Sequence, residues 1–163
     1  MSPLNLLAHA VELLAKPHCT EADRRRAISA AYYALFNALS VAAAETVAHR
    51  ASAQLRNQVR RSFGHGEIKK ACLAYLGSHS PSTPQQSGHM VSRDIFDVCL
   101  GFKGLHLARE DADYDLSQAA TQTEAVEFLE LAFVSVELWD GVQGTEEAAS
   151  FIATLYLMGR RRG

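Results

Sequence analysis

Arg109 is the residue whose position most clearly asks for a chemical explanation. Plotted as a helix, the surrounding segment places one charge on an otherwise apolar face, whose other members are Val98, Phe102, Leu105, Ala112 and Leu116. A charge on such a face is costly unless it is paired, and Asp113 stands one turn later, with His106 on the flank. Either Arg109 and Asp113 form an ion pair that orders the helix end, or Arg109 faces a phosphate or nucleotide.

A second candidate site is a basic stretch between residues 50 and 70, which carries six basic side chains and one acidic one. Arg56, Arg60 and Arg61 form its centre, and Gly64 and Gly66 mark a helix start beside them. A helix N-terminus among arginines suits an anion, so His65 is a candidate phosphate contact, although an ordinary loop-edge histidine is the alternative. Arg60 and His65 have an Arg-x4-His spacing, but chance alone gives such a match in this chain.

Acidic residues dominate the region from 110 to 147, with eleven carboxylates and no Lys or Arg. Glu124, Glu127 and Glu130 form a ladder there. This pattern favours a solvated face or a partner-binding surface over a pair of catalytic carboxylates. The total charge of −2 excludes a uniformly basic nucleic-acid binder. The separation of charge predicts a dipolar surface that can orient partners or two copies of the chain.

These residues require helices to position them, because helical periodicity dominates the sequence and strand patterns are nearly absent. We predict an all-α fold, an up-and-down bundle of about five to seven helices in a single domain over residues 1–163. A loop at about 77–89 and a basic tail at 159–163 complete it. The expected helices cover residues 3–16, 21–47, 52–63, 67–76, 93–112, 122–140 and 146–158, with Thr121 or Thr123 capping the sixth.

Several functional classes find no support in the sequence. Three widely spaced cysteines give neither a disulfide framework nor a zinc pattern, and His79 and His89 lack further ligands at suitable spacing. No phosphate-binding loop or nucleophile elbow is present, and the apolar stretch 28–48 is interrupted by polar residues, so we expect a buried helix. We therefore expect a cytoplasmic protein with no metal, no cofactor and no membrane partner. A sixth helix that is apolar nearly all round predicts a homodimer.

Two segments resemble the small prokaryotic HEPN-domain proteins. The first is Arg26-Ala-Ile-Ser-Ala-Ala-Tyr-Tyr-Ala-Leu-Phe-Asn-Ala38, which is similar to the family's Ala-Tyr-Tyr-Ala-x-Phe core preceded by a basic residue. Its signature residues are Arg26, Tyr32, Tyr33 and Phe36. The second runs from Arg109 to Asp115 and is similar to the family's Arg-x-x-Ala-Asp-Tyr signature, with Tyr114 as the tyrosine.

The resemblance implies a helical bundle, often dimeric, that binds RNA or nucleotides, acts as a ribonuclease toxin, or pairs with a nucleotidyltransferase-type antitoxin. Catalytic members carry Arg-x4–6-His, whereas Tyr114, Asp115 and Leu116 stand at those positions here. A tyrosine of ordinary pKa is a poor base near neutral pH. The sequence therefore favours a non-catalytic binding module, part of a toxin–antitoxin or defence system, that uses Arg109, Asp113, Tyr114 and the basic patch. The alternatives are a metal-free ribonuclease in which His106 or His65 replaces the missing base, and a structural dimer or adaptor.

Overall fold

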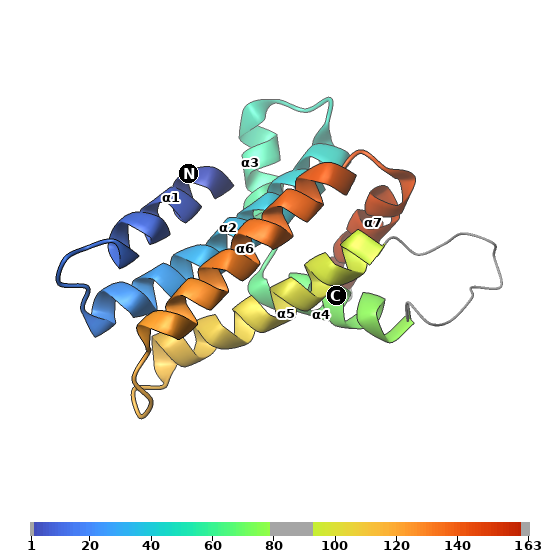
Figure 1. Ribbon diagram of the computed structural model, residues 1–163. Coiled ribbons are helices and arrows are strands. Elements are labelled where there is room, and N and C mark those ends of the chain that lie inside the picture. The colour runs from blue at the N-terminus through green and yellow to red at the C-terminus, as the bar shows by residue number, and fades with distance from the viewer. Residues whose placement is uncertain (1, 79–92, 161–163) are drawn as a thin grey trace.

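The computed structural model describes residues 2–78 and 93–160, the last three of these by their backbone alone. Within them the chain forms helices and no strand, which confirms the predicted all-α fold (Figure 1). The seven helices are α1 (Pro3–Leu14), α2 (Glu21–Ala48), α3 (Ala53–Ser62), α4 (His65–Ser78), α5 (Arg93–Tyr114), α6 (Gln122–Val142) and α7 (Glu146–Arg160).

Side-chain caps explain where two of the long central helices, α2 and α6, begin. The Thr20 side chain accepts a hydrogen bond from the Asp23 backbone N–H, and the Asp23 carboxylate accepts one from the Thr20 N–H, so α2 begins with a capping box. Thr121 and Glu124 form the same reciprocal arrangement at α6. Thr121, and not Thr123, is therefore the cap of the sixth helix.

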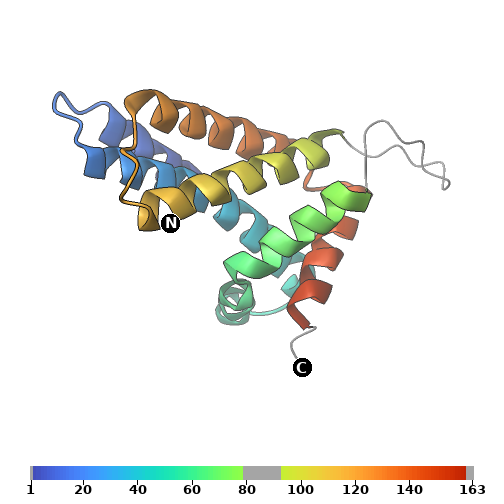
Figure 2. The ribbon, with the colours of Figure 1, turned by 90° about the horizontal axis from the view of Figure 1, so that it is seen from below.

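Helix α2 is the central element, because it contacts each of the other helices. Helices α1, α2, α5 and α6 lie side by side along much of their lengths (Figure 1). Helices α4 and α7 pack against each other at an angle to this group, as Figure 2 shows from below. Helix α4 contacts both α5 and α2. These contacts bring the connection between α3 and α4 close to the middle of α2.

Helix α2 is buried along one face, where Ile28, Tyr32 and Leu35 are almost fully enclosed, in agreement with the buried helix expected over the apolar stretch 28–48. By length and composition alone α2 could also cross a membrane. However, 72% of its most apolar 18-residue window is buried inside the bundle, as expected of a core helix.

Three predicted details differ from the structure. Helix α4 begins at His65 and not at 67, so Gly66 lies within its first turn, and α4 extends through Gly77 and Ser78. The rest of the predicted 77–89 loop lies outside the described residues. Leu116 follows the end of α5 and is 81% exposed, so it does not continue the apolar face of that helix. Helix α7 continues into the predicted basic tail as far as Arg160, and Arg161 and Arg162 lie outside the described residues.

The three cysteines differ in their accessibility, which gives a simple test of the packing. Cys72 and Cys99 are buried, whereas Cys19 is partly exposed. Burial raises the pKa of the Cys72 thiol, and the neighbouring Cys99 thiol raises it further. Since the thiolate is the reactive form, we expect iodoacetamide to modify Cys19 rapidly and Cys72 and Cys99 only after denaturation. Equal rates at all three positions, followed by peptide mass spectrometry, would contradict this packing.

Candidate functional site

His65 lies at the centre of an aromatic cluster that joins α4 to the middle of α2. Its Nδ1 atom is 2.7 Å from the hydroxyl of Tyr32, a side chain that is otherwise fully buried. The His65 ring centroid is 4.4 Å from that of Phe36 and 5.6 Å from that of Tyr33. His65 is thus placed against the three aromatic residues of the first HEPN-like motif.

A cavity of about 430 Å³ opens beside this cluster. Its lining residues come from α1, α2, α3 and the start of α4, and they are Leu6, Tyr33, Phe36, Asn37, Ser40, Arg60, Arg61, Phe63 and His65. The Arg60 guanidinium donates a 3.0 Å hydrogen bond to Asn37 Oδ1, which fixes one end of α3 on α2. The structure therefore brings Arg60 and Arg61 of the predicted basic patch together with Tyr33 and Phe36 of the first motif in one cavity, which we call the aromatic–arginine pocket.

Arg56 lies outside this pocket but close to it. It lines a smaller neighbouring hollow of about 150 Å³ together with Arg60. Its guanidinium donates a 2.6 Å hydrogen bond to the Ala51 carbonyl. Arg60 thus stands between the two hollows, and the basic patch extends from one to the other.

Arg109 forms an ion pair with Asp113, one of the two alternatives that the sequence leaves open for it. Its Nε atom is 2.7 Å from Asp113 Oδ2, and the Arg109 side chain is 15% exposed. Asp113 also accepts a 2.6 Å hydrogen bond from the Ser29 hydroxyl, so the pair ties α5 to α2. These contacts give Arg109 a clear structural role at the end of α5.

The guanidinium of Arg109 also lies between two tyrosine side chains. It donates hydrogen bonds of 3.4 Å to the hydroxyls of Tyr33 and Tyr114, and its Cζ atom is 5.9 Å and 5.2 Å from the two ring centroids. Tyr33 is shared, because it also lines the aromatic–arginine pocket. Arg109 does not line that pocket and reaches it only through Tyr33, while Tyr114 is 72% exposed.

His106, a candidate catalytic base, is enclosed in the core. It is 5% exposed, and its ring is stacked on Phe102 with an interplanar angle of 9°. Its Nε2 atom is 3.4 Å from Glu110 Oε1. The Nδ1 atom of His106 is buried and its Nε2 atom faces Glu110, whereas His65 lines a cavity.

Two arginines that sequence reasoning did not assign to a site hold the neighbouring helix ends. Arg25 donates hydrogen bonds of 2.9 Å to the carbonyls of Ala112 and Asp115, at the C-terminal end of α5. Arg24 donates one of 2.6 Å to the Ala120 carbonyl. Arg26, the basic residue of the first motif, is exposed on α2 and makes none of these contacts. Helical spacing places Arg25 on the same face of α2 as the buried Ile28 and Tyr32, so the sequence does indicate that this arginine turns inward.

The chemistry available in the pocket is cationic and aromatic. Two guanidinium groups can bind phosphate oxygens, and the rings of Tyr33 and Phe36 can pack against a planar group. Among the residues that the structure describes, no three His, Cys, Asp or Glu side chains are grouped to hold a metal ion. The arrangement suits recognition of an anion that carries an aromatic ring.

The two enclosed histidines predict how stability depends on pH. Burial lowers the pKa of His65 and of His106, and the charge of Arg109 lowers both further. Below about pH 6.5 the two histidines bind protons more readily in the unfolded chain than in the folded one. Their contribution to the free energy of unfolding is therefore fully present above that pH and is lost as the pH falls. Urea unfolding should give a lower free energy of unfolding at about pH 5.5 than at about pH 7.5, and a smaller difference in His65→Gln. Equal stability at the two pH values would contradict this prediction.

Comparisons with protein-family models, with curated proteins and with solved structures find no match to this chain. The fold and the pocket define an all-helical bundle with an aromatic–arginine cavity. The likeness to HEPN-domain proteins rests on the two motifs in the sequence.

Proposed function

We propose that the protein is a non-catalytic HEPN-type module that binds single-stranded RNA or a nucleotide in the aromatic–arginine pocket. The observation that carries this proposal is the meeting of Arg60 and Arg61 with Tyr33 and Phe36 around one cavity. These residues come from two segments that the sequence presents separately, one basic and one aromatic.

Each side chain of the pocket has a defined part in this proposal. An unpaired base packs against the rings of Tyr33 and Phe36, and the adjoining phosphate binds Arg60 and Arg61. A base in a duplex is already stacked on its neighbours, so its faces are not available to these rings. The proposal therefore requires a preference for single strands.

Fluorescence anisotropy with a labelled single-stranded RNA of about eight nucleotides tests the proposal, because one such site covers a few nucleotides. We expect the affinity to fall steeply as NaCl rises from about 50 to about 300 mM, since bound phosphates release counterions. An unlabelled duplex of the same sequence should compete weakly, and mononucleotides should compete for the same site. Absence of binding at low salt, or equal affinity for single strand and duplex, would reject it.

A second candidate function, a metal-free ribonuclease, is favoured by the position of His65. Its Nδ1 atom is 2.7 Å from the Tyr32 hydroxyl, and the role requires the tautomer in which Nδ1–H donates to that oxygen and Nε2 is free to accept a proton. The lowered pKa keeps the ring neutral at neutral pH. His65 would take the proton of a ribose 2′-OH that attacks the adjacent phosphorus. The bond from phosphorus to the 5′ oxygen then breaks, and the leaving oxygen takes a proton from water.

A cleavage assay separates the two candidates. Total RNA incubated with pure protein is expected to stay intact if the module only binds. If cleavage occurs, His65→Gln should reduce it about 100-fold or more, as expected of a general base, whereas His106→Gln should leave it nearly unchanged. Cleavage that survives His65→Gln would exclude this site as its source.

The proposed toxin–antitoxin setting follows from the HEPN resemblance, and the proposed homodimer follows also from the apolar character of the sixth helix. We infer that the protein is a homodimer and belongs to a toxin–antitoxin or defence system. Its partner in that system is a nucleotidyltransferase-type antitoxin. The alternative is a structural or adaptor role that does not involve RNA. Phe133 and Val134 on α6 are 43% and 53% exposed in the single chain, which leaves apolar surface for such a contact. Light scattering of the purified protein tests the dimer, and co-purification with the product of the adjacent gene tests the antitoxin.

A further inference from the structure

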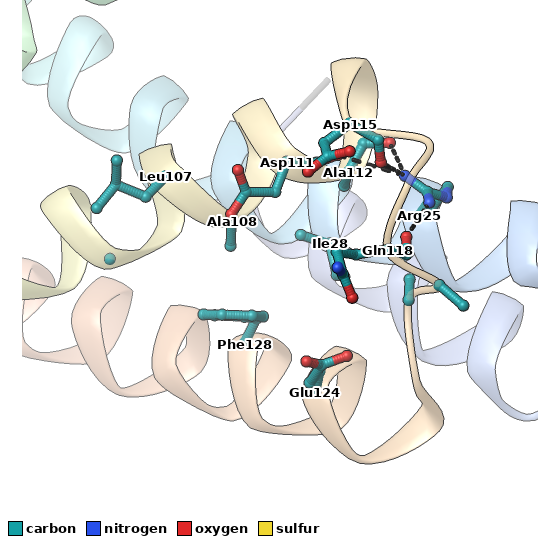
Figure 3. Close-up of a pocket in the computed structure, with 13 residues that line it drawn as sticks. Arg25, Ile28, Leu107, Ala108, Asp111, Ala112, Asp115, Gln118, Glu124 and Phe128 are labelled. Carbon is teal, nitrogen blue, oxygen red and sulfur yellow. Dashed lines mark hydrogen bonds between the residues drawn. The ribbon is translucent and has the colours of Figure 1, made fainter.

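A second and larger cavity lies on another part of the molecule, between α5 and α6. Its volume is about 530 Å³, and its walls include the last turns of α5, the connection to α6 and the first turns of α6 (Figure 3). None of its lining residues belongs to the aromatic–arginine pocket. We call it the α5–α6 groove.

The groove has an apolar floor. Ile28, Ala108 and Ala112 are buried members of one small core cluster, and Phe128 packs against them from α6. Leu107 borders the groove on α5 and is 48% exposed. An apolar side chain of a ligand would therefore find apolar contacts on several sides.

Carboxylates line the rim of the groove. Asp111 and Asp115 lie at its α5 side, and Glu124 lies on the α6 side opposite them (Figure 3). None of these three forms an ion pair with another side chain of the described part of the chain. Hydrogen bonds from Ser117 and from Thr121 lower the pKa values of Asp115 and Glu124, so both stay ionised at neutral pH.

Arg25, the one cation among the lining residues, offsets part of this negative charge and helps to lower the pKa of Asp115, which leaves the groove net negative. Arg25 is 12% exposed, and its guanidinium is directed at the backbone carbonyls of Ala112, Asp115 and Gln118 and at the Glu21 carboxylate. Its hydrogen-bonding groups are occupied within the fold. A ligand that approaches from solvent therefore meets an apolar floor and a negative rim.

We propose that the α5–α6 groove is a docking site for a basic amphipathic helical segment of a partner protein. An apolar side chain of that segment enters the floor between Ala108 and Phe128, and Lys or Arg side chains one turn away reach Asp111, Asp115 and Glu124. This is the way in which amphipathic helices bind in grooves between helices. Charge complementarity identifies the partner's chemistry, because three carboxylates of the acidic region, Asp111, Asp115 and Glu124, line the groove.

A second copy of the chain is a poorer occupant. A two-fold contact places the same surface on both sides, so Asp111, Asp115 and Glu124 of one copy would face their equivalents on the other. Like charges brought together in this way destabilise an interface. A foreign basic segment meets no such repulsion.

Selection of peptides from a displayed library on the intact protein tests the proposal. The library consists of randomised helical peptides of about four turns. We expect the selected sequences to carry apolar residues at helical spacing flanked by Lys or Arg. Selected peptides without net positive charge, or a selection that enriches no sequence, would overturn the proposal.

Two charge reversals on the protein locate the bound peptide. Asp111→Lys changes an exposed rim residue whose side chain makes no hydrogen bond among the described residues, and it should weaken binding of the selected peptides about tenfold or more. Glu137→Lys, the matched control, makes the same change of charge on an exposed part of α6 that does not line the groove, and it should weaken binding less than about twofold. Equal effects of the two reversals would show that binding reflects overall charge and would overturn the site.

The oligomeric state provides a further test. We expect Leu107→Ser to abolish peptide binding and to leave the mass of the protein in solution unchanged by light scattering. If the substitution instead dissociates an oligomer, a second copy occupies the groove and the proposal fails. Far-ultraviolet circular dichroism of each variant verifies that the helices are retained.

Discussion

Gly101→Ala is expected to lower the free energy of unfolding by about 3 kcal/mol, because α5 and α6 approach closely at this residue. A Cβ atom built on Gly101 would lie 2.1 Å from Ser135 Oγ and 3.1 Å from Ser135 Cβ. The Ser135 hydroxyl is itself held by a 2.7 Å hydrogen bond to the Leu131 carbonyl. Rotation of Ser135 would break this hydrogen bond and would leave its Cβ atom 3.1 Å from the new Cβ, so the two helices must also shift by a few tenths of an ångström. Urea unfolding followed by circular dichroism measures the loss.

Removal of the opposing side chain separates this explanation from a general intolerance of change in α5. In Gly101→Ala combined with Ser135→Gly, the space left by the Ser135 side chain accommodates the new methyl group, and the double variant should be more stable than Gly101→Ala alone. Gly141→Ala is the matched control. No atom lies within 4 Å of its added Cβ, and we expect it to stabilise α6 by up to about 1 kcal/mol. A Gly101→Ala protein as stable as the natural one would contradict the close packing.

The helices could be predicted from the sequence because their signals are local. Capping pairs such as Thr20 with Asp23 and Thr121 with Glu124 lie three residues apart, and the apolar spacing within each helix repeats every turn. The Arg109–Asp113 ion pair was predictable for the same reason, since both residues lie on one helix. The close approach at Gly101 was not, because it depends on the residue that the neighbouring helix presents.

The candidate site was only partly predictable. Arg60, Arg61 and His65 were candidates for phosphate contact, and Tyr33 and Phe36 belonged to a motif, but their meeting depends on how α3 and α4 fold back on α2. His65 bonds to a tyrosine 33 residues earlier, and no periodicity encodes that contact. The α5–α6 groove was missed because its floor and its rim come from three separate helices.

Replacement of both Arg60 and Arg61 by alanine is expected to have the largest effect on RNA binding. Each guanidinium lines the aromatic–arginine pocket, and each charged contact with a phosphate contributes about 1 kcal/mol, so the double variant should bind single-stranded RNA about 30-fold more weakly. Two lost phosphate contacts should also reduce the slope of log affinity against log salt by about 1.4.

The slope distinguishes loss of phosphate contacts from damage to the pocket. Phe36→Leu, which removes a ring and no charge, should weaken binding while leaving the slope unchanged, because base stacking releases no counterions. Arg93→Ala is the charge-matched control, since Arg93 is 71% exposed on α5 and pairs with Asp97 away from the pocket. Arg93→Ala removes one charge and the double variant removes two. If Arg93→Ala lowers the affinity and the slope by half as much as the double variant does, RNA binds through overall charge and the pocket assignment is wrong.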